Sequence, residues 1–325
     1  MPISSNKKKR AQKSLNIYLG VDGGGTKTQA VLIDEDKTAI GEGFAGASNP
    51  LRVGVETAVA NIFQAIDAAC DAAGKSRGDI VAASFGLAGV RRADLRQRVR
   101  ERLAEILRVK TVEVVTDAEI ALFGTTQGKA GVVLIAGTGS ICYGRNENGE
   151  TAIAGGWGPL AGDEGGGSSI ARRGLQAIAK ASDGRGVNTK LSQAGADYFR
   201  ASSAENLLVA IYTPQMDNAK IAGFARLVVE TAHEGDEIAV EILKDAGHEL
   251  GLAVNAVVQK LKLKNKKIPI GQVGSIFRAG ALLTDSLLET VHRFAPKAYL
   301  AEPLLQPASA AAQMAFEIYR KGEMR

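Results

Sequence analysis

The chain is poor in the residues that support several common kinds of site. Its 325 residues include two cysteines, three histidines and one tryptophan, and aromatic residues make up 5% of the sequence. Cys70 and Cys142 are far apart, so they have neither metal-ligand spacing nor the density of a disulfide scaffold. A zinc-binding module and a disulfide-rich secreted domain are therefore not expected, and a reducing, cytoplasmic setting is.

Long apolar runs are also missing. No segment approaches the ~20 consecutive apolar residues that span a bilayer, and the N-terminus lacks the apolar core of a secretory signal. The chain is 45% hydrophobic and 23% charged, which is ordinary for a globular protein. Its length suggests about two domains, and no membrane partner is expected.

An excess of positive charge is confined to the N-terminus. The formal net charge is +5, and residues 1–16 contain five basic residues and no acidic one. The remainder therefore carries equal numbers of basic and acidic side chains. We predict a disordered basic tail over 1–16 and a balanced body, which argues against a nucleic-acid partner.

The first half of the sequence alternates short apolar runs with amphipathic segments. Strands are predicted over 17–21, 29–33, 40–44, 81–87 and 112–115, with helices over 54–73 and 94–107. A three-strand meander followed by helical crossovers predicts a mixed sheet.

The second half repeats this order with an addition. Strands are predicted over 131–136, 141–145, near Ala152, and over 268–273 and 299–301, with helices over 280–294 and 309–319 and a long helical block over 168–262. We therefore expect an N-terminal domain over 17–125 and a C-terminal domain with a helical insertion over 126–308. The last segment, 309–325, is expected to be a helix that can pack back on the N-terminal domain.

Each half contains a tight turn of glycine and threonine between two predicted strands. The first is Gly20–Thr28 and the second is Leu134–Ser140. Glycine allows close backbone approach to a ligand, and successive turn N–H groups can form an anion site. Two such turns suggest a phosphate held from two sides. Gly74-Lys75-Ser76 does not fit a P-loop, because a helix rather than a strand precedes it.

Two aspartates end predicted strands. Asp22 lies beside the first glycine turn, where a carboxylate suits a Mg²⁺–phosphate site. Asp117 ends the last strand of the first half and can cap the next helix, act as a general base at the carboxyl ends of the strands, or do both.

The stretch Gly155–Gly165 combines the single tryptophan, several glycines and an Asp-Glu pair. A flat aromatic ring beside carboxylates suits a polyol, since carboxylates accept hydrogen bonds from hydroxyl groups. A structural corner around a buried Trp157 is the alternative. Asn49, before Pro50, is explained equally well by turn chemistry.

Together these segments resemble the BadF/BadG/BcrA/BcrD-type ATPase family and, within it, the N-acetylglucosamine kinase-like proteins of the actin/hexokinase/Hsp70 superfamily. The resemblance rests on Gly20–Thr28, Asn49, Thr116-Asp117-Ala118, Gly137–Ser140, Gly155–Gly165 and Gly274–Phe277. It implies two ribonuclease-H-like, actin-like ATPase domains with mixed sheets around an interdomain cleft, and ATP with Mg²⁺ as cofactors.

The resemblance also implies a role for each site residue. Asp117 would be the catalytic base and Asp22 the metal ligand. The nucleotide and phosphates would be bound by Gly24, Gly25, Thr26, Lys27, Thr138, Gly139, Gly274 and Ser275. The sugar would be bound by Asn49, Gly156, Trp157, Gly158 and Asp163. The family pattern has polar residues at two positions occupied here by Ala88 and Ile141, which puts the identity of the sugar in question.

The leading hypothesis is an ATP-dependent kinase that converts N-acetylglucosamine to its 6-phosphate. Glucosamine or another sugar is the alternative acceptor, and a homodimer is left open. An ATPase that activates a partner enzyme through an iron–sulfur cluster is a rival, although the two cysteines lack suitable spacing. A sugar-sensing repressor is another rival, which the short segment before the first strand disfavours.

Overall fold

The structure is a computed structural model, and it describes residues 16–214 and 216–323. The predicted basic tail, 1–16, lies outside the described residues apart from Asn16. Contacts divide the chain into two compact units. Unit 1 ends at Asp117 and resumes at Pro307, and unit 2 spans Ala118–Gln306.

Sheet A belongs to unit 1 and has the strand order β3-β2-β1-β4-β5. Its strands are β1 (Ile17–Gly23), β2 (Thr28–Ile33), β3 (Ala39–Ala45), β4 (Ile80–Leu87) and β5 (Thr111–Thr116). The first three are antiparallel neighbours, while β4 and β5 run parallel to β1. The central strands β1 and β4 are buried along nearly their whole length, as apolar strands covered on both faces are.

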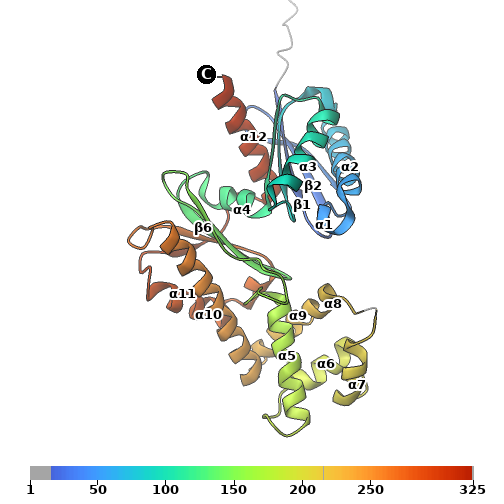
Figure 1. The fold of residues 1–325 in the computed structure, drawn as a ribbon, viewed down its shortest axis with the longest axis vertical. Helices are drawn as coiled ribbons and strands as arrows, with labels where there is room; N and C mark the ends of the chain where they lie inside the picture. The colour runs from blue at the N-terminus through green and yellow to red at the C-terminus, as the bar shows by residue number, and fades with distance from the viewer. Residues whose placement is uncertain (1–15, 215, 324–325) are drawn as a thin grey trace, which may run out of the picture. The chain divides into compact units, whose positions relative to one another are not determined.

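Helices α2 (Val55–Ala73) and α3 (Ala93–Leu107) cover one face of sheet A (Figure 1). Each presents an apolar stripe at helical spacing to the strands. Gly74 ends α2 in the left-handed conformation that glycine adopts readily. Two short elements were not predicted, because their sequences are typical of turns: α1 (Pro50–Val53) and the 3₁₀ turn η1 (Arg77–Asp79).

The opposite face of sheet A is covered by α12 (Pro307–Glu323), drawn in red beside the strands in Figure 1. Its alanines approach the sheet closely, and a Cβ atom on Gly20 would lie 2.1 Å from the backbone nitrogen of Ala312. Phe316 packs edge-on against Tyr18 with ring centroids 4.9 Å apart. Gly20, included above in the first glycine turn, therefore makes room for a helix.

Sheet B of unit 2 repeats the arrangement with the order β10-β9-β6-β7-β8. Its strands are β6 (Gly131–Ala136), β7 (Ser140–Arg145), β8 (Thr151–Gly155), β9 (Pro269–Val273) and β10 (Tyr299–Ala301). Again the first three are antiparallel neighbours and the last two run parallel to the first. The two halves therefore share one topology, as predicted.

The predicted helical block is a series of separate helices in unit 2. They are α5 (Gly167–Ser182), α6 (Leu191–Phe199), α7 (Ala204–Ile211), α8 (Asn218–Gly223), α9 (Ala225–His233) and α10 (Glu237–Lys260). The 3₁₀ turn η2 (Ser275–Ala279) and α11 (Ala281–His292) follow β9. No helix of the described residues has the length and apolar character needed to cross a bilayer.

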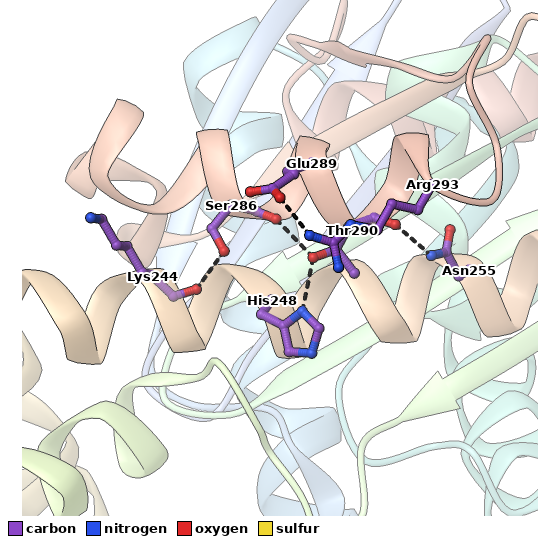
Figure 2. A network of polar contacts seen from close by, with 7 residues as sticks. All are labelled: Lys244, His248, Asn255, Ser286, Glu289, Thr290 and Arg293. Carbon is purple, nitrogen blue, oxygen red and sulfur yellow. Dashed lines mark hydrogen bonds and ion pairs between the residues drawn. The ribbon is translucent and has the colours of Figure 1, made fainter.

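Helices α10 and α11 pack closely, and both cover one face of sheet B. A Cβ atom on Gly247 would lie 2.2 Å from the Leu283 carbonyl oxygen. Polar groups also link the helices, as Figure 2 shows: Asn255 donates to the Thr290 carbonyl oxygen at 2.9 Å, and the Thr290 hydroxyl lies 2.9 Å from Nδ1 of His248. These contacts rigidify the support of sheet B.

Two helices are exchanged between the halves of the sequence. Helix α4 (Asp117–Thr126) follows β5 of sheet A, but its apolar residues pack on the free face of sheet B. Helix α12 follows β10 of sheet B but packs on sheet A. The chain divides into its two units at 117/118 because α4 packs on sheet B.

Candidate functional site

In unit 1, polar residues gather where the parallel strands of sheet A end. Gly23 is paired with Leu87 and Leu87 with Thr116, so β1, β4 and β5 end at the same edge. Asp22 precedes Gly23, and Asp117 begins α4 directly after β5. Carboxyl ends of parallel strands are the usual ligand-binding edge of open α/β sheets.

The two carboxylates influence each other. Burial first, and then the negative charge of Asp117, raise the pKa of Asp22 to about 6, although the charge of Lys27 opposes the rise. A buried acid beside a second acid is destabilised in its charged form unless a cation is bound. Because the two negative charges repel each other, the pair suits a divalent cation, which would neutralise them.

Loop 1, residues 24–27 between β1 and β2, is fixed by its own backbone and by the next loop. The Gly24 N–H donates to the Lys27 carbonyl oxygen at 3.0 Å, while the N–H groups of Ser48 and Asn49 donate to the Gly24 carbonyl oxygen at 3.0 and 3.1 Å. Thr26 and Lys27 are exposed at its tip. Loop 1 therefore presents a hydroxyl and an ammonium group on a rigid turn.

Asn49 has a structural contact that its sequence position predicts. Its side-chain oxygen accepts a hydrogen bond from the Leu51 N–H at 3.0 Å and caps α1. The Asn49 side chain also lies against Gly89 in the loop after β4, where a Cβ atom would come within 2.3 Å of Oδ1. Asn49 thus stands at the same edge of sheet A as loop 1.

Loop 2, residues 137–139 between β6 and β7, is the counterpart in unit 2. The Gly137 N–H donates to the Gly139 carbonyl oxygen at 2.9 Å. The start of α5 supports it from outside, because Gly167 and Ser168 donate to the carbonyl oxygens of Gly137 and Thr138 at 2.7 and 2.8 Å. Thr138 itself is exposed.

The segment that begins with the last residue of β8, residues 155–166, is called the tryptophan segment below. Gly155, Gly156 and Gly158 have positive φ angles, which explains the density of glycine. Trp157 is 71% exposed, so the alternative of a buried structural corner is wrong. Leu160, at 97%, is exposed on the same segment.

Asp163 is the buried acid of the tryptophan segment. It is 7% exposed, and its carboxylate accepts a hydrogen bond from the Ser140 N–H at 3.3 Å. Burial raises its pKa, and so does the charge of Glu164, while hydrogen bonds from the backbone of Ser140 and Gly158 and the charge of Arg172 oppose the rise. The carboxylate therefore bridges loop 2 and the tryptophan segment.

A cavity of about 470 Å³ opens beside loop 2 within unit 2. Thr138 and Ser275 line it, each just after the carboxyl end of one of the parallel neighbours β6 and β9, and Arg226 and Arg278 are among the other lining residues. Gly274 has a φ of 116°, and a Cβ atom there would lie 2.2 Å from the Ala136 carbonyl oxygen, so glycine is required. The cavity is large enough for a nucleoside.

Part of the cavity wall was missed by the sequence analysis. It comes from α6, α8 and α9 and includes Tyr198, Ala219, Ala222, Gly223, Ala225, Arg226 and Val229. The only signal in the sequence is the run of small residues across α8 and α9. Small residues at helical spacing expose backbone and leave room for a flat ligand, but they also occur at ordinary helix contacts.

The proposed residues therefore form two groups, one in each unit. The unit 1 group is Asp22, Gly24, Gly25, Thr26, Lys27, Asn49 and Asp117. In unit 2, Thr138, Gly139, Gly274 and Ser275 surround or support the cavity, while Gly156, Trp157, Gly158 and Asp163 lie on the neighbouring segment. No cluster of three or more metal-ligating side chains occurs in the described part of the chain.

Comparison with known proteins gives a consistent picture. The chain is 34% identical over 284 residues to the N-acetylmuramic acid/N-acetylglucosamine kinase of Clostridium acetobutylicum, covering 87% of this chain and 92% of that protein. It is 33% identical over 313 residues to the N-acetyl-D-glucosamine kinase of Dictyostelium discoideum, covering 93% and 98%.

A crystal structure from Chromobacterium violaceum, of a proposed N-acetylglucosamine kinase, has a TM-score of 0.73 at 25% identity. The match covers 93% of this chain and 99% of that one and extends over both sheets, so the fold is the two-domain actin-like ATPase fold. A model of the BadF/BadG/BcrA/BcrD ATPase family matches residues 19–315. The chain therefore belongs to the BadF/BadG/BcrA/BcrD ATPase family and is similar to its N-acetylglucosamine kinase-like members.

Proposed function

We propose that the protein transfers the γ-phosphoryl group of ATP to a hydroxyl group of N-acetylglucosamine, at C6, with Asp117 as the general base. The observation that carries the proposal is the electrostatically coupled pair Asp22–Asp117 at the ligand-binding edge of sheet A. A sugar hydroxyl is a poor nucleophile at neutral pH, and a carboxylate within reach accepts its proton as attack proceeds. The names of the related kinases support the same reaction.

The nucleotide is assigned to the two glycine loops and the cavity of unit 2. Backbone N–H groups of tight glycine turns suit phosphate oxygens, and Lys27 adds a positive charge at loop 1. The cavity beside loop 2, with Ser275 and Gly274 at its border, suits the adenosine. Phosphoryl transfer requires positioning and neutralisation of charge more than covalent participation by the protein. The loops and the cavity suit positioning, and Lys27 suits neutralisation of charge.

A magnesium ion is assigned to Asp22, with Asp117 nearby. The raised pKa of Asp22 beside a second acid is the observation that fits a cation, and Mg²⁺ needs only one or two protein carboxylates besides water and phosphate oxygens. When bound, it would neutralise charge on the transferred phosphoryl group. Lys27 opposes the rise in pKa and so keeps Asp22 in the ionised form that binds a metal.

The sugar is assigned to Asn49, Gly156, Trp157, Gly158 and Asp163. An exposed tryptophan on a glycine-rich segment can lie flat against a sugar ring, and glycine leaves backbone groups open to hydroxyls. Ile141 packs against this segment, since a Cβ atom on Gly156 would lie 2.9 Å from its Cδ1. An apolar side chain there suits the methyl of an acetyl group better than a hydroxyl.

The activator-type ATPase is less well supported. A cluster held by cysteines needs accessible thiolates, but Cys70 and Cys142 are both buried. Burial raises the pKa of Cys70 to about 11, and burial also raises the pKa of Cys142. Both thiols are therefore protonated and shielded at neutral pH.

The test is ATP consumption, coupled to ADP detection, with a panel of acceptors at equal concentration. The panel contains N-acetylglucosamine, glucosamine, N-acetylmuramic acid, N-acetylmannosamine and glucose. The proposal expects the highest kcat/KM for N-acetylglucosamine and a product phosphorylated at C6, identified by NMR. ATP hydrolysis unaffected by any sugar would overturn it in favour of the ATPase, and a preference for glucosamine would reassign the acceptor.

A further inference from the structure

The short helix α1 is bonded directly to loop 1. The N–H groups of Ser48 and Asn49, which lead into the helix, donate to the Gly24 carbonyl oxygen of loop 1 at 3.0 and 3.1 Å. Asn49 also caps α1 and is assigned above to the sugar. The start of α1 therefore carries a residue assigned to the acceptor and is held against the loop assigned to the phosphates.

Arg52 extends from α1 to the same loop. Its Nη1 atom donates to the Gly25 carbonyl oxygen at 3.4 Å, and a Cβ atom on Gly25 would lie 2.8 Å from Nη1. Glycine at this position leaves the space that the arginine side chain occupies. The backbone of Arg52 is fixed as well, since its N–H donates to the Asn49 carbonyl oxygen at 3.0 Å. Backbone and side chain together hold the guanidinium group beside loop 1.

The guanidinium group of Arg52 has donors to spare. Arginine carries five N–H donors, and the contact with Gly25 uses one of them. The side chain is exposed, and in the part of the chain that the structure describes no carboxylate forms an ion pair with it. Because a planar guanidinium group matches the spacing of phosphate oxygens, an arginine with open donors beside a phosphate loop suits a phosphoryl group.

The charges at this edge of sheet A call for another cation. In the proposed reaction the sugar oxygen forms a bond to the γ-phosphorus, and Asp117 takes the hydroxyl proton. The bond from that phosphorus to the β–γ bridging oxygen breaks, and its electron pair leaves with ADP. The transferred group is negatively charged and passes beside the acids Asp22 and Asp117, so positive groups next to it lower the barrier. Lys27 is one such group at loop 1, and Arg52 is a second.

We propose that Arg52 is a catalytic residue whose guanidinium group binds oxygens of the γ-phosphoryl group as it passes from ATP to the sugar. The inference rests on the proposed function, because it takes loop 1 as a phosphate site and Asn49 as a sugar contact. An interaction made mainly with the transferring group raises kcat and leaves KM nearly unchanged. An arginine that only supported loop 1 would instead change nucleotide affinity together with turnover.

Steady-state kinetics of Arg52→Ala test the assignment. We expect kcat with N-acetylglucosamine to fall about 100-fold, while the KM values and the calorimetric affinity for ADP change little. Arg52→Lys keeps the charge without the planar group and should recover part of the loss. Guanidinium chloride at millimolar concentration should also restore turnover to Arg52→Ala, because the free ion can take the place of the missing group.

A transition-state analogue gives a readout that does not require turnover. ADP with aluminium fluoride, Mg²⁺ and N-acetylglucosamine mimics the transferring group, and Arg52→Ala should bind it about 100-fold more weakly while binding ADP normally. Arg100→Ala is the matched control, since Arg100 is also an exposed arginine of unit 1 and its Nε donates to one carbonyl oxygen, that of Val112, at 3.0 Å. Val112 lies near the start of β5, whereas Asp117 follows its end, so turnover and analogue binding should be retained.

The outcomes separate this inference from the proposed function. Unchanged turnover and analogue binding in Arg52→Ala would overturn the role of Arg52, as would equal losses of affinity for ADP and for the analogue. If ATP is hydrolysed but no sugar is phosphorylated, the proposed function fails and the hydrolysis rate tests Arg52 instead. A loss of about 100-fold in Arg52→Ala then supports its contact with the phosphoryl group, and an unchanged rate overturns it. Arg52→Met, which keeps a long side chain without the charge, repeats each comparison if Arg52→Ala does not fold.

Discussion

The two units have the same strand order, but they differ in the functional groups and cavities that they carry. In unit 1, β1 carries Asp22 one residue before its end and β5 leads into Asp117, so carboxylates stand at the edge of sheet A. In unit 2, the corresponding strand β6 ends in Ile135 and Ala136, and the acid after β10 is Glu302. Unit 2 has instead the cavity and the tryptophan segment. One topology thus carries carboxylates at the strand ends in one copy and a cavity with an exposed tryptophan segment in the other.

The largest expected effect comes from replacing the acid that follows the last strand of sheet A, compared with the acid that follows the last strand of sheet B. Asp117→Asn should lower kcat by on the order of 10³-fold, because a neutral amide cannot accept the proton of the sugar hydroxyl. Calorimetric affinity for the nucleotide should change little. Glu302→Gln, which alters the acid after the equivalent strand of sheet B, serves as control and should keep normal turnover. Equal losses in both variants would contradict the division between the units.

The two glycines of loop 2 should respond differently to alanine. At Gly139 the new Cβ atom would lie 2.5 Å from the Asp163 carboxylate, whereas at Gly137 nothing lies within 4 Å. We expect Gly139→Ala to lower the free energy of unfolding by about 1–3 kcal/mol and Gly137→Ala to leave it nearly unchanged. Urea denaturation followed by circular dichroism measures both. Equal stability of the two variants would show that Asp163 is not confined by loop 2.

The buried acid of unit 1 predicts a dependence of stability on pH. Burial first, and then the charge of Asp117, raise the pKa of Asp22 from 3.8 to about 6 in the folded protein. The unfolded chain therefore loses this proton at lower pH than the folded one, and Asp22 reduces stability as pH rises from about 4 to 6. At pH 7.5 the cost is at most about 3 kcal/mol.

Asp22→Asn should accordingly stabilise the protein without metal at pH 7.5 and have a much smaller effect at pH 4. Urea unfolding at the two pH values in the presence of a chelator measures this difference. The same substitution should abolish stabilisation of the protein by Mg²⁺ and nucleotide together. A variant less stable than the unaltered protein at pH 7.5 would mean that Asp22 has favourable partners in the folded state.

The smallest effect is expected at the exposed ion pair that joins β2–β3 of sheet A to α12. Lys37 and Glu317 are 2.9 Å apart, but their side chains are 38% and 42% exposed, so water and salt weaken the attraction. Lys37→Ala should change the unfolding free energy by less than about 0.5 kcal/mol. Phe316→Ala, beneath it on the same helix, should cost about 3 kcal/mol because it empties part of the apolar contact. Similar losses would mean that charge rather than packing holds α12.

The sequence predicted those features that depend on local pattern. Alternating apolar residues located the strands of both sheets to within a residue or two, and the glycine turns were placed between the correct strands. Asp22 and Asp117 could be recognised because strand ends are visible in sequence. The repeated β-β-β-α-β order allowed the common topology to be predicted without any obvious repeat of residues.

Features that depend on distant contacts could not be predicted. Gly20 reads as part of a phosphate loop, but its lack of a side chain makes room for Ala312, almost three hundred residues away. The burial of Asp163 could not be predicted either, because it depends on the chain after loop 2, where the Ser140 N–H donates to the carboxylate. Most of the breaks between helices in the predicted block 168–262 could not be placed, because the sequence favours helix through much of it and packing decides where each helix ends.

The exchange of α4 and α12 has a consequence for how the molecule is made. During synthesis from the N-terminus, sheet A is complete by residue 116, yet one of its faces stays bare until α12 is translated. That face includes Tyr18, Val31 and Ile33, which would be exposed to other chains in the meantime. The core of the unit that carries Asp22 and Asp117 is thus completed only when α12 has been translated, and until then chaperones and proteases can recognise the uncovered apolar face.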